Sequence, residues 1–386
     1  MSSPSASSIP ESQFVNEVRV NLRQWVLAVV LVSIIVLLTP WLWTKLERFE
    51  IGADYRLPYS LSKDYWLYAR RLGELNEAKQ IPVLGDSVVW GEYVRPDGSL
   101  SHFLNEQAGG AGSFANAGVN GQFPLALEGL VRYYGGAIRD RKVLLHCNLL
   151  WMTSPKVDLS AKKEEKFNHV GLVPQFAPRI PCYRAEIADR LGIVIGRQVP
   201  FMAWVDHLQT AYFDQQNILA WTLAGNGSDA ASYTNAYKNP LAQITRRVPT
   251  APADDPERGP RSPRHKPWSG TGQGTQRFEW VDLNASLQWG AFQRLTEILR
   301  ARHNSLLVVV GPFNEHIMAA ENRAAFRKLR DGAVQWLQEN KIAFAVLETL
   351  PSELYADASH PLTEGYERMA KSLAQDAAFQ NWLKAR

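Results

Sequence analysis

The chain has 386 residues, of which 46% are hydrophobic and 21% are charged, and 42 Lys and Arg against 38 Asp and Glu leave a net charge of +4. This composition excludes wholesale disorder, a collagen-like fibre and a polytopic membrane protein, and the charge is too mild for a typical nucleic-acid-binding protein. Two cysteines, Cys147 and Cys182, are too few for a disulfide scaffold or a cysteine zinc site. One disulfide between them stays open, although the apolar run around Cys147 favours a buried free thiol.

The first predicted element is an apolar helix near the N-terminus. Residues 25–43 contain no charged side chain, and tryptophans stand at both ends of the segment. A helix of this length spans roughly 28 Å, about the hydrocarbon thickness of a bilayer, and indole rings favour the bilayer interfaces. Because residues 39–43 make a poor cleavage site, an uncleaved membrane-spanning helix is favoured over a signal peptide.

The positive charges that flank this helix are balanced, with Arg19 and Arg23 before it and Lys45 and Arg48 after it. We therefore base the orientation on the tail at 1–24, which is short and polar. The simplest arrangement leaves this tail in the cytoplasm and places the large C-terminal part outside.

The rest of the chain alternates short apolar runs with helical patterns. A juxtamembrane stalk at 44–80 comes first, with a helical pattern at 60–79. Strands are predicted at 81–84, 113–117, 142–148, 305–310 and 343–347. Helices are predicted at 100–108, 122–135, 284–303, 318–340 and 361–384. Continuous apolar runs suit parallel strands that are buried on both faces. The pattern therefore predicts an α/β fold, a three-layer doubly wound parallel sheet of five strands of the flavodoxin type.

A long insertion at 151–283 interrupts this alternation, so the predicted catalytic domain consists of 81–150 and 284–386. The insertion has an aromatic helical stretch around 201–223, which we expect to pack on the main domain, with lipid or glycan binding as the alternative. Residues 249–275 are dense in proline, glycine and charge, and this composition predicts a mobile loop or linker.

A Gly-Asp-Ser tripeptide follows the first predicted strand. Gly85 allows a sharp turn from strand to helix, and such a turn exposes the Ser87 hydroxyl at the edge of the sheet. The helix that follows directs its free N–H groups at the same place, where they can bind a developing oxyanion. Asp86 is interpreted as the cap of this helix. Taken alone, the tripeptide is a common turn sequence.

Asp357 and His360 lie three residues apart near the other end of the chain. Pro361 suits the first turn of a helix, so both residues are expected in the loop that enters it. The carboxylate of Asp357 can then orient the imidazole and stabilise its charged form while His360 takes a proton from Ser87. In isolation, the simpler interpretation is that Asp357 caps the helix and His360 lies on the surface.

Together, the Gly-Asp-Ser tripeptide and the later Asp-x-x-His resemble the signature of the SGNH/GDSL hydrolase family. Residues 116–121 are similar to that family's second block, and residues 143–148 are similar to its third. The resemblance implies a catalytic set of Ser87, His360 and Asp357. It also implies that the backbone N–H of Gly121 and the side-chain amide of Asn148 donate to the oxyanion.

The third block differs from the family pattern at two positions. His146 stands where the family usually has glycine, and Leu149 stands where it has aspartate. Asn314, after the fourth predicted strand, is the rival to Asn148 for the oxyanion role. Asn148 is preferred because it follows the second block by one helix and one strand, as the doubly wound order requires.

The resemblance implies a serine esterase, with an ester-bearing glycan or a small ester as its substrate and O-acetyl as the leading acyl group. The predicted helix at 25–43 would anchor this enzyme in the membrane with its catalytic domain outside the cytoplasm. The first alternative is an O-acyltransferase that modifies a cell-surface polysaccharide with the help of a polytopic acyl-donating partner. Further alternatives are a catalytically inactive glycan-binding or scaffolding protein, and a lipase or thioesterase at the bilayer surface. No metal or other cofactor is expected, because the remaining histidines lack metal-ligand spacing. No nucleic-acid partner is expected either.

Overall fold

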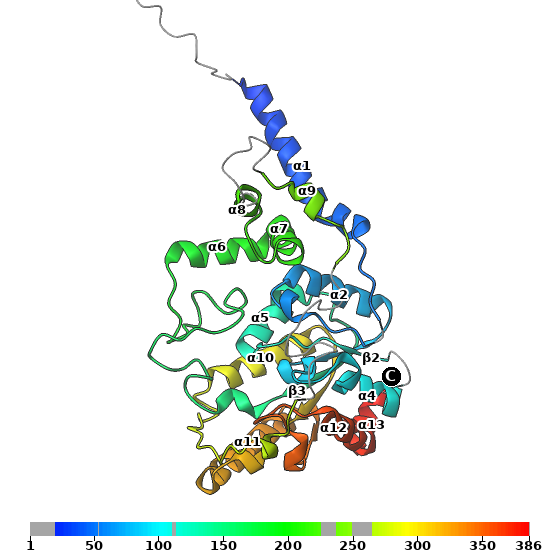
Figure 1. Ribbon diagram of the computed structural model, residues 1–386, viewed down its shortest axis with the longest axis vertical. Coiled ribbons are helices and arrows are strands. Elements are labelled where there is room, and N and C mark those ends of the chain that lie inside the picture. Colours follow the sequence, from blue (N-terminus) through cyan, green and yellow to red (C-terminus); the bar gives the residue numbers. More distant parts are fainter. Residues whose placement is uncertain (1–19, 53, 110–112, 225–236, 249–264, 386) are drawn as a thin grey trace, which may run out of the picture. The chain divides into compact units, whose positions relative to one another are not determined.

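The computed structural model describes residues 20–52, 54–109, 113–224, 237–248 and 265–385 (Figure 1). The chain divides into two units, Met1–Leu46 and Glu47–Arg386. The first unit contains helix α1 (Leu22–Leu46), whose 25 residues extend about 37 Å at 1.5 Å per residue. Among the described residues, α1 is the helix that is long and apolar enough to cross a membrane. The helix begins three residues before the predicted segment and ends three residues after it.

The centre of the second unit is a five-stranded sheet in which every neighbouring pair is parallel. The strands are β1 (Ile81–Leu84), β2 (Phe114–Asn116), β3 (Lys142–Cys147), β4 (Ser305–Val310) and β5 (Ala343–Val346). Their order in space is β2-β1-β3-β4-β5, the flavodoxin-like order of doubly wound folds. The predicted α/β class and five-stranded parallel sheet are therefore confirmed.

Helices cover both faces of this sheet and make three layers (Figure 1). One face carries α2 (Tyr65–Glu77), α5 (Pro124–Tyr134), α10 (Leu287–Ala301) and α11 (Arg323–Glu339). The other carries α4 (Leu100–Leu104), α12 (Thr363–Gln375) and α13 (Ala377–Lys384). Successive residues of the central strands enter opposite cores: Leu145 and Val308 face the first set of helices, and Leu144 and Leu307 face the second. Burial on both faces accounts for the continuous apolar runs in the sequence.

Three predicted helices differ from the observed ones. The helix predicted at 60–79 begins at Tyr65, after a short 3₁₀ turn at Tyr59–Leu61. The predicted helix at 361–384 is two helices, because the backbone turns at Asp376 and its carboxylate caps α13 by accepting from the Phe379 N–H at 2.8 Å. The helix predicted to begin at 318 begins at Arg323, after two short 3₁₀ turns.

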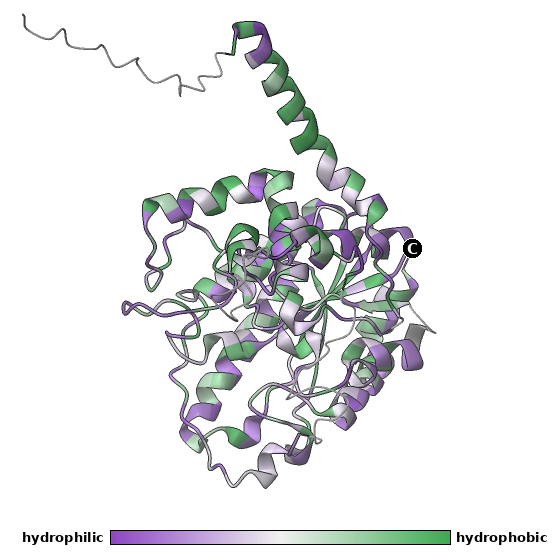
Figure 2. Cartoon of the chain, turned by 45° about the horizontal axis from the view of Figure 1, so that its top comes forward, coloured by the Kyte–Doolittle hydropathy of each residue, from purple (hydrophilic) through white to green (hydrophobic). Residues whose placement is uncertain are grey.

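The described part of the insertion contains four α-helices: α6 (Ile187–Gln198), α7 (Pro200–Tyr212), α8 (Ile218–Leu223) and α9 (Pro240–Gln243). Part of the predicted loop at 249–275 falls on 249–264, outside the described residues. Its remainder contains one short 3₁₀ turn, Trp268–Gly270. Figure 2 shows the hydrophobic residues concentrated along α1 and in the strands of the sheet.

The two cysteines are buried free thiols in the structure. Cys147 ends β3 inside the main core, where burial raises the pKa of its thiol. The expected free thiol at Cys147 is confirmed.

Candidate active site

Ser87 begins a short helix, α3 (Ser87–Trp90), and only Gly85 and Asp86 separate it from the end of β1 at Leu84. A side chain on Gly85 would not fit this turn, since its Cβ would lie 2.5 Å from Val89 Cγ2 and 3.1 Å from His146 Cβ. Asp86 caps the helix as predicted, with Oδ1 accepting from the Val88 N–H at 3.0 Å. The Gly-Asp-Ser sequence thus makes the strand-to-helix turn that brings Ser87 to the carboxyl edge of the sheet.

Asp357 and His360 lie in a tight loop between β5 and α12. The loop is closed by an antiparallel bridge between Tyr355 and Pro361 and by a bond from the Ala356 N–H to the His360 carbonyl at 2.8 Å. Inside it, Asp357 Oδ1 accepts from the backbone N–H groups of Ser359 and His360, at 2.9 and 3.0 Å. These bonds hold the carboxylate in the orientation in which it contacts the imidazole.

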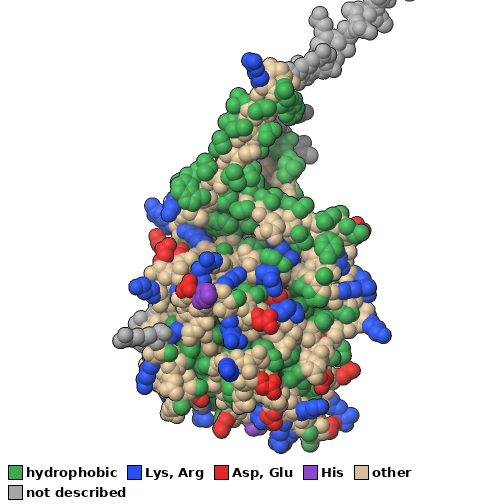
Figure 3. Space-filling view, turned by 180° about the vertical axis from the view of Figure 1, so that it is seen from behind, with side chains coloured by type: hydrophobic (Ala, Val, Ile, Leu, Met, Phe, Trp, Pro, Cys, Tyr) green, Lys and Arg blue, Asp and Glu red, His purple; other side chains and the backbone are tan. Residues whose placement is uncertain are grey.

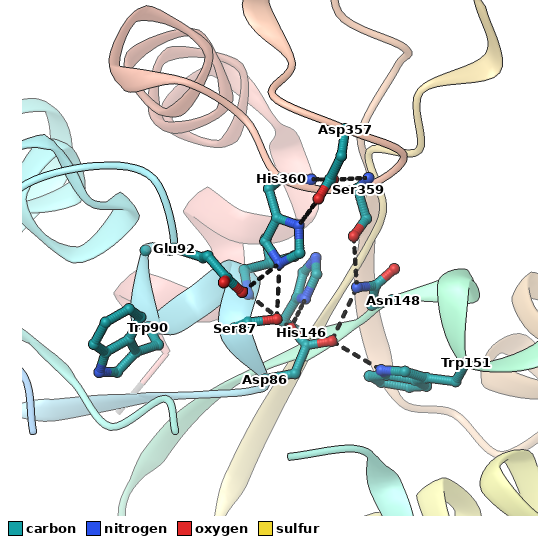
Figure 4. Close-up of polar contacts among 12 residues, drawn as sticks. Asp86, Ser87, Trp90, Glu92, His146, Asn148, Trp151, Asp357, Ser359 and His360 are labelled. Atoms are coloured by element: carbon teal, nitrogen blue, oxygen red, sulfur yellow. Dashed lines mark hydrogen bonds and ion pairs between the residues drawn. The ribbon is translucent and has the colours of Figure 1, made fainter. Parts of the chain in front are cut away.

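The three predicted catalytic side chains are in contact (Figure 4). Nδ1 of His360 lies 2.8 Å from both carboxylate oxygens of Asp357, and Nε2 lies 2.7 Å from Ser87 Oγ. Because a carboxylate only accepts, the neutral ring carries its proton on Nδ1 and offers the Nε2 lone pair to the serine hydroxyl. This is the proton path that a serine nucleophile requires.

The charges around His360 favour the imidazolium. Burial of the ring lowers its pKa, but Asp357, Glu92 and Asp86 outweigh burial and raise the pKa of His360 to about 8. Burial also opposes ionisation of Asp357, yet His360 and the two N–H bonds hold the pKa of this carboxyl at about 2. Asp357 is therefore a carboxylate throughout the neutral range, and His360 is a stronger base than an ordinary histidine.

Asp86 connects the serine turn to the end of β3. Its Oδ2 accepts from Asn148 Nδ2 at 2.9 Å and from Trp151 Nε1 at 2.8 Å. Burial raises the pKa of this fully buried group, but His146, His360 and the Val88 N–H more than compensate, so the pKa lies below its ordinary value. A buried carboxylate with this many donors holds β1 and β3 in a fixed relation at the site.

Of the two residues that the resemblance assigns to the oxyanion, Asn148 is brought to the site. Besides its bond to Asp86, Asn148 Nδ2 donates to Ser359 Oγ in a longer bond of 3.3 Å. The side-chain oxygen Oδ1 of Asn148 accepts from the Leu150 N–H. Gly121 lies in the loop after β2 with φ +69°, where a side chain would collide with Asn168. That loop is tied to the serine turn by a bond from the Val119 N–H to the Gly85 carbonyl at 3.3 Å.

The rival asparagine has a different position. Asn314 Nδ2 donates to the Asp357 carbonyl at 3.0 Å, and its backbone N–H donates to the Ala358 carbonyl at 2.9 Å. Asn314 therefore supports the histidine loop. His146 is a core histidine whose Nε2 donates to the Gly311 carbonyl at 2.9 Å, and its Nδ1 lies 3.8 Å from Asp86.

Three further residues at the site are not predicted by the sequence motifs. Glu92 places Oε2 at 3.5 Å from His360 Nε2, and the ring of Tyr93 meets the imidazole edge-on with centroids 5.4 Å apart. Trp151 is the third, through its bond to Asp86. Glu92 and Tyr93 follow closely after the short helix that begins at Ser87. Their proximity to Ser87 in the sequence is the feature that could have predicted their place at the site.

No protein-family model matches the chain, and no curated protein matches it. Within the residues that the structure describes, no group of three or more His, Cys, Asp or Glu side chains is arranged to hold a metal ion.

Proposed function

We propose that the chain is a membrane-anchored, extracytoplasmic serine esterase of the SGNH/GDSL type that removes ester-linked acyl groups, with glycan O-acetyl groups as the leading substrate. The observation that supports this proposal is the continuous path from Asp357 through His360 to Ser87, with contacts of 2.8 and 2.7 Å. The resemblance of four sequence blocks, all near the carboxyl edge of the sheet, supports it further.

In the proposed reaction, Ser87 Oγ attacks the ester carbonyl and its proton passes to His360 Nε2. Asp357 stabilises the imidazolium, and the tetrahedral oxyanion accepts from the Ser87 N–H and the other proposed donors, Gly121 and Asn148. For Asn148, the oxyanion would take over the long bond now made to Ser359. Collapse breaks the ester bond, the leaving alkoxide takes the proton from His360, and an acyl group remains on Ser87.

The acyl group on Ser87 is then transferred to an oxygen nucleophile. Water, after losing a proton to His360, gives a free acid, and this path makes the protein an esterase. A sugar hydroxyl that follows the same path receives the acyl group, and the protein is then an O-acyltransferase. In both paths Ser87 leaves with the proton held by His360.

A cavity next to the predicted oxyanion glycine favours the acyltransferase as the second candidate. The cavity has a volume of about 230 Å³, borders Gly121, and is lined by Phe123, Phe167, Lys156 and Lys166 among others. Aromatic and basic side chains in one concave surface can hold an acceptor sugar near the acyl-serine.

Full-length protein in detergent, incubated with acetyl esters with and without an oligosaccharide acceptor, tests both candidates. Acetate release without sugar modification indicates the esterase, and acetylated sugar indicates the transferase. Ser87→Ala is the control; it should stay folded and lose turnover by several orders of magnitude, roughly 10⁶-fold for the comparable serine of a well-studied protease. A fluorophosphonate should label Ser87, as shown by mass spectrometry, and absence of both label and turnover would leave the glycan-binding protein as the remaining candidate.

We also propose that α1 anchors the chain, on the basis of its length and apolar composition, and that residues 47–386 lie outside the cytoplasm, on the basis of the short polar tail at 1–24. Protease added to intact cells should then digest the second unit. Protection of this unit until the membrane is permeabilised would reverse the orientation.

A further inference from the structure

The first residue after α1 is buried in a charged cluster of the second unit. Glu47 has a fully buried side chain that accepts from His207 Nε2 at 2.8 Å, from the Tyr212 hydroxyl at 2.5 Å and from an Arg70 nitrogen at 2.8 Å. His207 also contacts Asp64 through Nδ1 at 2.6 Å. This Glu47 cluster joins the start of the second unit to α7 of the insertion through side chains that are mutually paired and buried.

The next residue is joined to the end of the insertion's helical part. The Arg48 N–H donates to the Arg246 carbonyl at 2.9 Å, and the Val248 N–H donates to the Arg48 carbonyl at 3.1 Å. Arg48, Arg246 and Arg247 are all exposed. The three arginines therefore lie on two paired segments of backbone. One of these segments contains Arg48, two residues after the end of α1.

The insertion helices expose many large apolar side chains. Ile187, Leu191 and Ile195 recur at every fourth position and therefore share one side of α6, where they are 71%, 47% and 57% exposed. Exposed apolar side chains continue on the helices and the segment that follow. We call the whole set the insertion apolar surface; it consists of Ile187, Leu191, Ile195, Met202, Leu219, Leu223, Tyr237 and Leu241.

This exposure is concentrated in one part of the second unit. Figure 1 shows α6 to α9 gathered beyond α2, away from α11 to α13, and Figure 3 shows hydrophobic side chains at that end with Lys and Arg side chains beside them. Large exposed apolar surface of this kind usually marks an interface with a protein or a membrane. We favour the bilayer as the partner of this surface, because α1, the proposed membrane anchor, ends at Leu46, directly before Glu47.

We propose that the insertion apolar surface rests in the interface of the bilayer that α1 spans, and that Arg48, Arg246 and Arg247 bind its anionic lipid headgroups. Amphipathic helices with basic neighbours bind bilayers in this way, through apolar burial and attraction to anionic lipid. The Glu47 cluster fixes the insertion at the point where the chain leaves the membrane. The inference rests on the proposed anchoring by α1, and it gives the insertion the task of orienting the catalytic domain over the bilayer.

Fluorescence quenching of the full-length protein in lipid nanodiscs tests the proposal. Because both native cysteines are buried, a fluorophore can be attached to single cysteines introduced as Leu191→Cys, Leu219→Cys or Leu241→Cys, with Val346→Cys on the edge strand as the control. Lipids with a spin label near the headgroup should quench the three insertion probes strongly and the control weakly. Equal quenching at all four positions would overturn the proposal.

The same probes distinguish the bilayer from a second copy of the chain. In detergent without lipid, an aqueous quencher should reach the three insertion probes at every protein concentration. Protection that grows with protein concentration would mean that another copy covers this surface, and the proposal would be wrong.

The arginines are tested by comparing anionic with neutral nanodiscs. Replacing all three by glutamine should reduce quenching of the insertion probes in anionic nanodiscs to the level seen in neutral ones, and Arg277→Gln, at another exposed arginine, should leave it unchanged. Unchanged quenching in the triple variant would refute the headgroup contacts. Alkaline carbonate extraction of the wild type separates the two proposals: release from membranes refutes the anchor itself, whereas retention with unquenched probes refutes only the surface contact.

Discussion

Oε2 of Glu92 lies 3.5 Å from Nε2 of His360, the same nitrogen that contacts Ser87 Oγ at 2.7 Å. Gly91, with φ 85°, ends α3 and turns the chain so that Glu92 faces the ring. The imidazole thus lies between two carboxylates, with Asp357 at Nδ1 and Glu92 beside Nε2. Both stabilise the charged ring, and this sets the pH at which the proposed base is ready to accept a proton.

The pH dependence of ester hydrolysis should follow His360. Because the base must be neutral and its pKa is raised to about 8, kcat/KM should increase with pH through about 8. Glu92→Gln removes one of the charges that favour the imidazolium, so the midpoint should move to lower pH. A pH–rate profile measures this shift, and Glu339→Gln on α11 is a matched control that should leave the midpoint in place. An unshifted profile for Glu92→Gln would show that this carboxylate does not act on the ring.

Removal of the Asp357 charge should reduce turnover strongly while the protein stays folded. Asp357→Asn no longer holds the Nδ1 proton in place, and in serine proteases the equivalent change lowers kcat by about 10⁴-fold. Asp376→Asn, which keeps a capping side chain on α13, should retain wild-type turnover. Steady-state kinetics with an acetyl ester, together with thermal unfolding, checks both variants. Wild-type kcat in Asp357→Asn would exclude Asp357 from the proposed triad.

The oxyanion role of Asn148 can be separated from its bond to Asp86. Asn148→Ala should lower kcat by about 10²–10³-fold, the usual cost of one oxyanion donor, with little change in KM. Trp151→Phe removes the other side-chain donor to Asp86 Oδ2 without removing a donor to the oxyanion, and should cost much less activity. If both variants lose kcat equally, Asn148 acts only by holding Asp86.

The Glu47 cluster should make the free energy of unfolding decrease at alkaline pH. Burial lowers the pKa of His207, but Asp64 and Glu47 outweigh it and raise the pKa from 6.5 to about 9. Since the folded state binds this proton more tightly, the stabilisation is complete below pH 6.5 and is lost as the pH rises through about 9.

His207→Gln tests this dependence by difference. The variant should unfold more easily at pH 6.5, by a few kcal/mol and up to about 5 kcal/mol if the buried carboxylates are left without a charged partner. The gap in free energy of unfolding between wild type and variant should narrow as the pH approaches 10, as measured by denaturant unfolding in detergent. A gap that stays constant over this range would show that His207 is neutral in the folded protein.

The sequence by itself determined the strands and the approximate positions of most helices, because these depend on local patterns. Short apolar runs, several of them continuous, located the five strands of the described sheet, and Gly85 with Asp86 predicted the turn and the cap that present Ser87. The Asp-x-x-His spacing likewise predicted the contact between Asp357 and His360, since a short loop is enough to bring them together.

Only the tertiary structure decided how these elements meet. The contact between Ser87 and His360 joins residues 273 positions apart, and it exists because β1 and the loop after β5 reach the same edge of one parallel sheet. The bond from Asn148 to Asp86 depends in the same way on β1 and β3 being neighbours. Local patterns specify which side chains are buried, whereas strand order and the directions of buried side chains follow from packing over the whole domain.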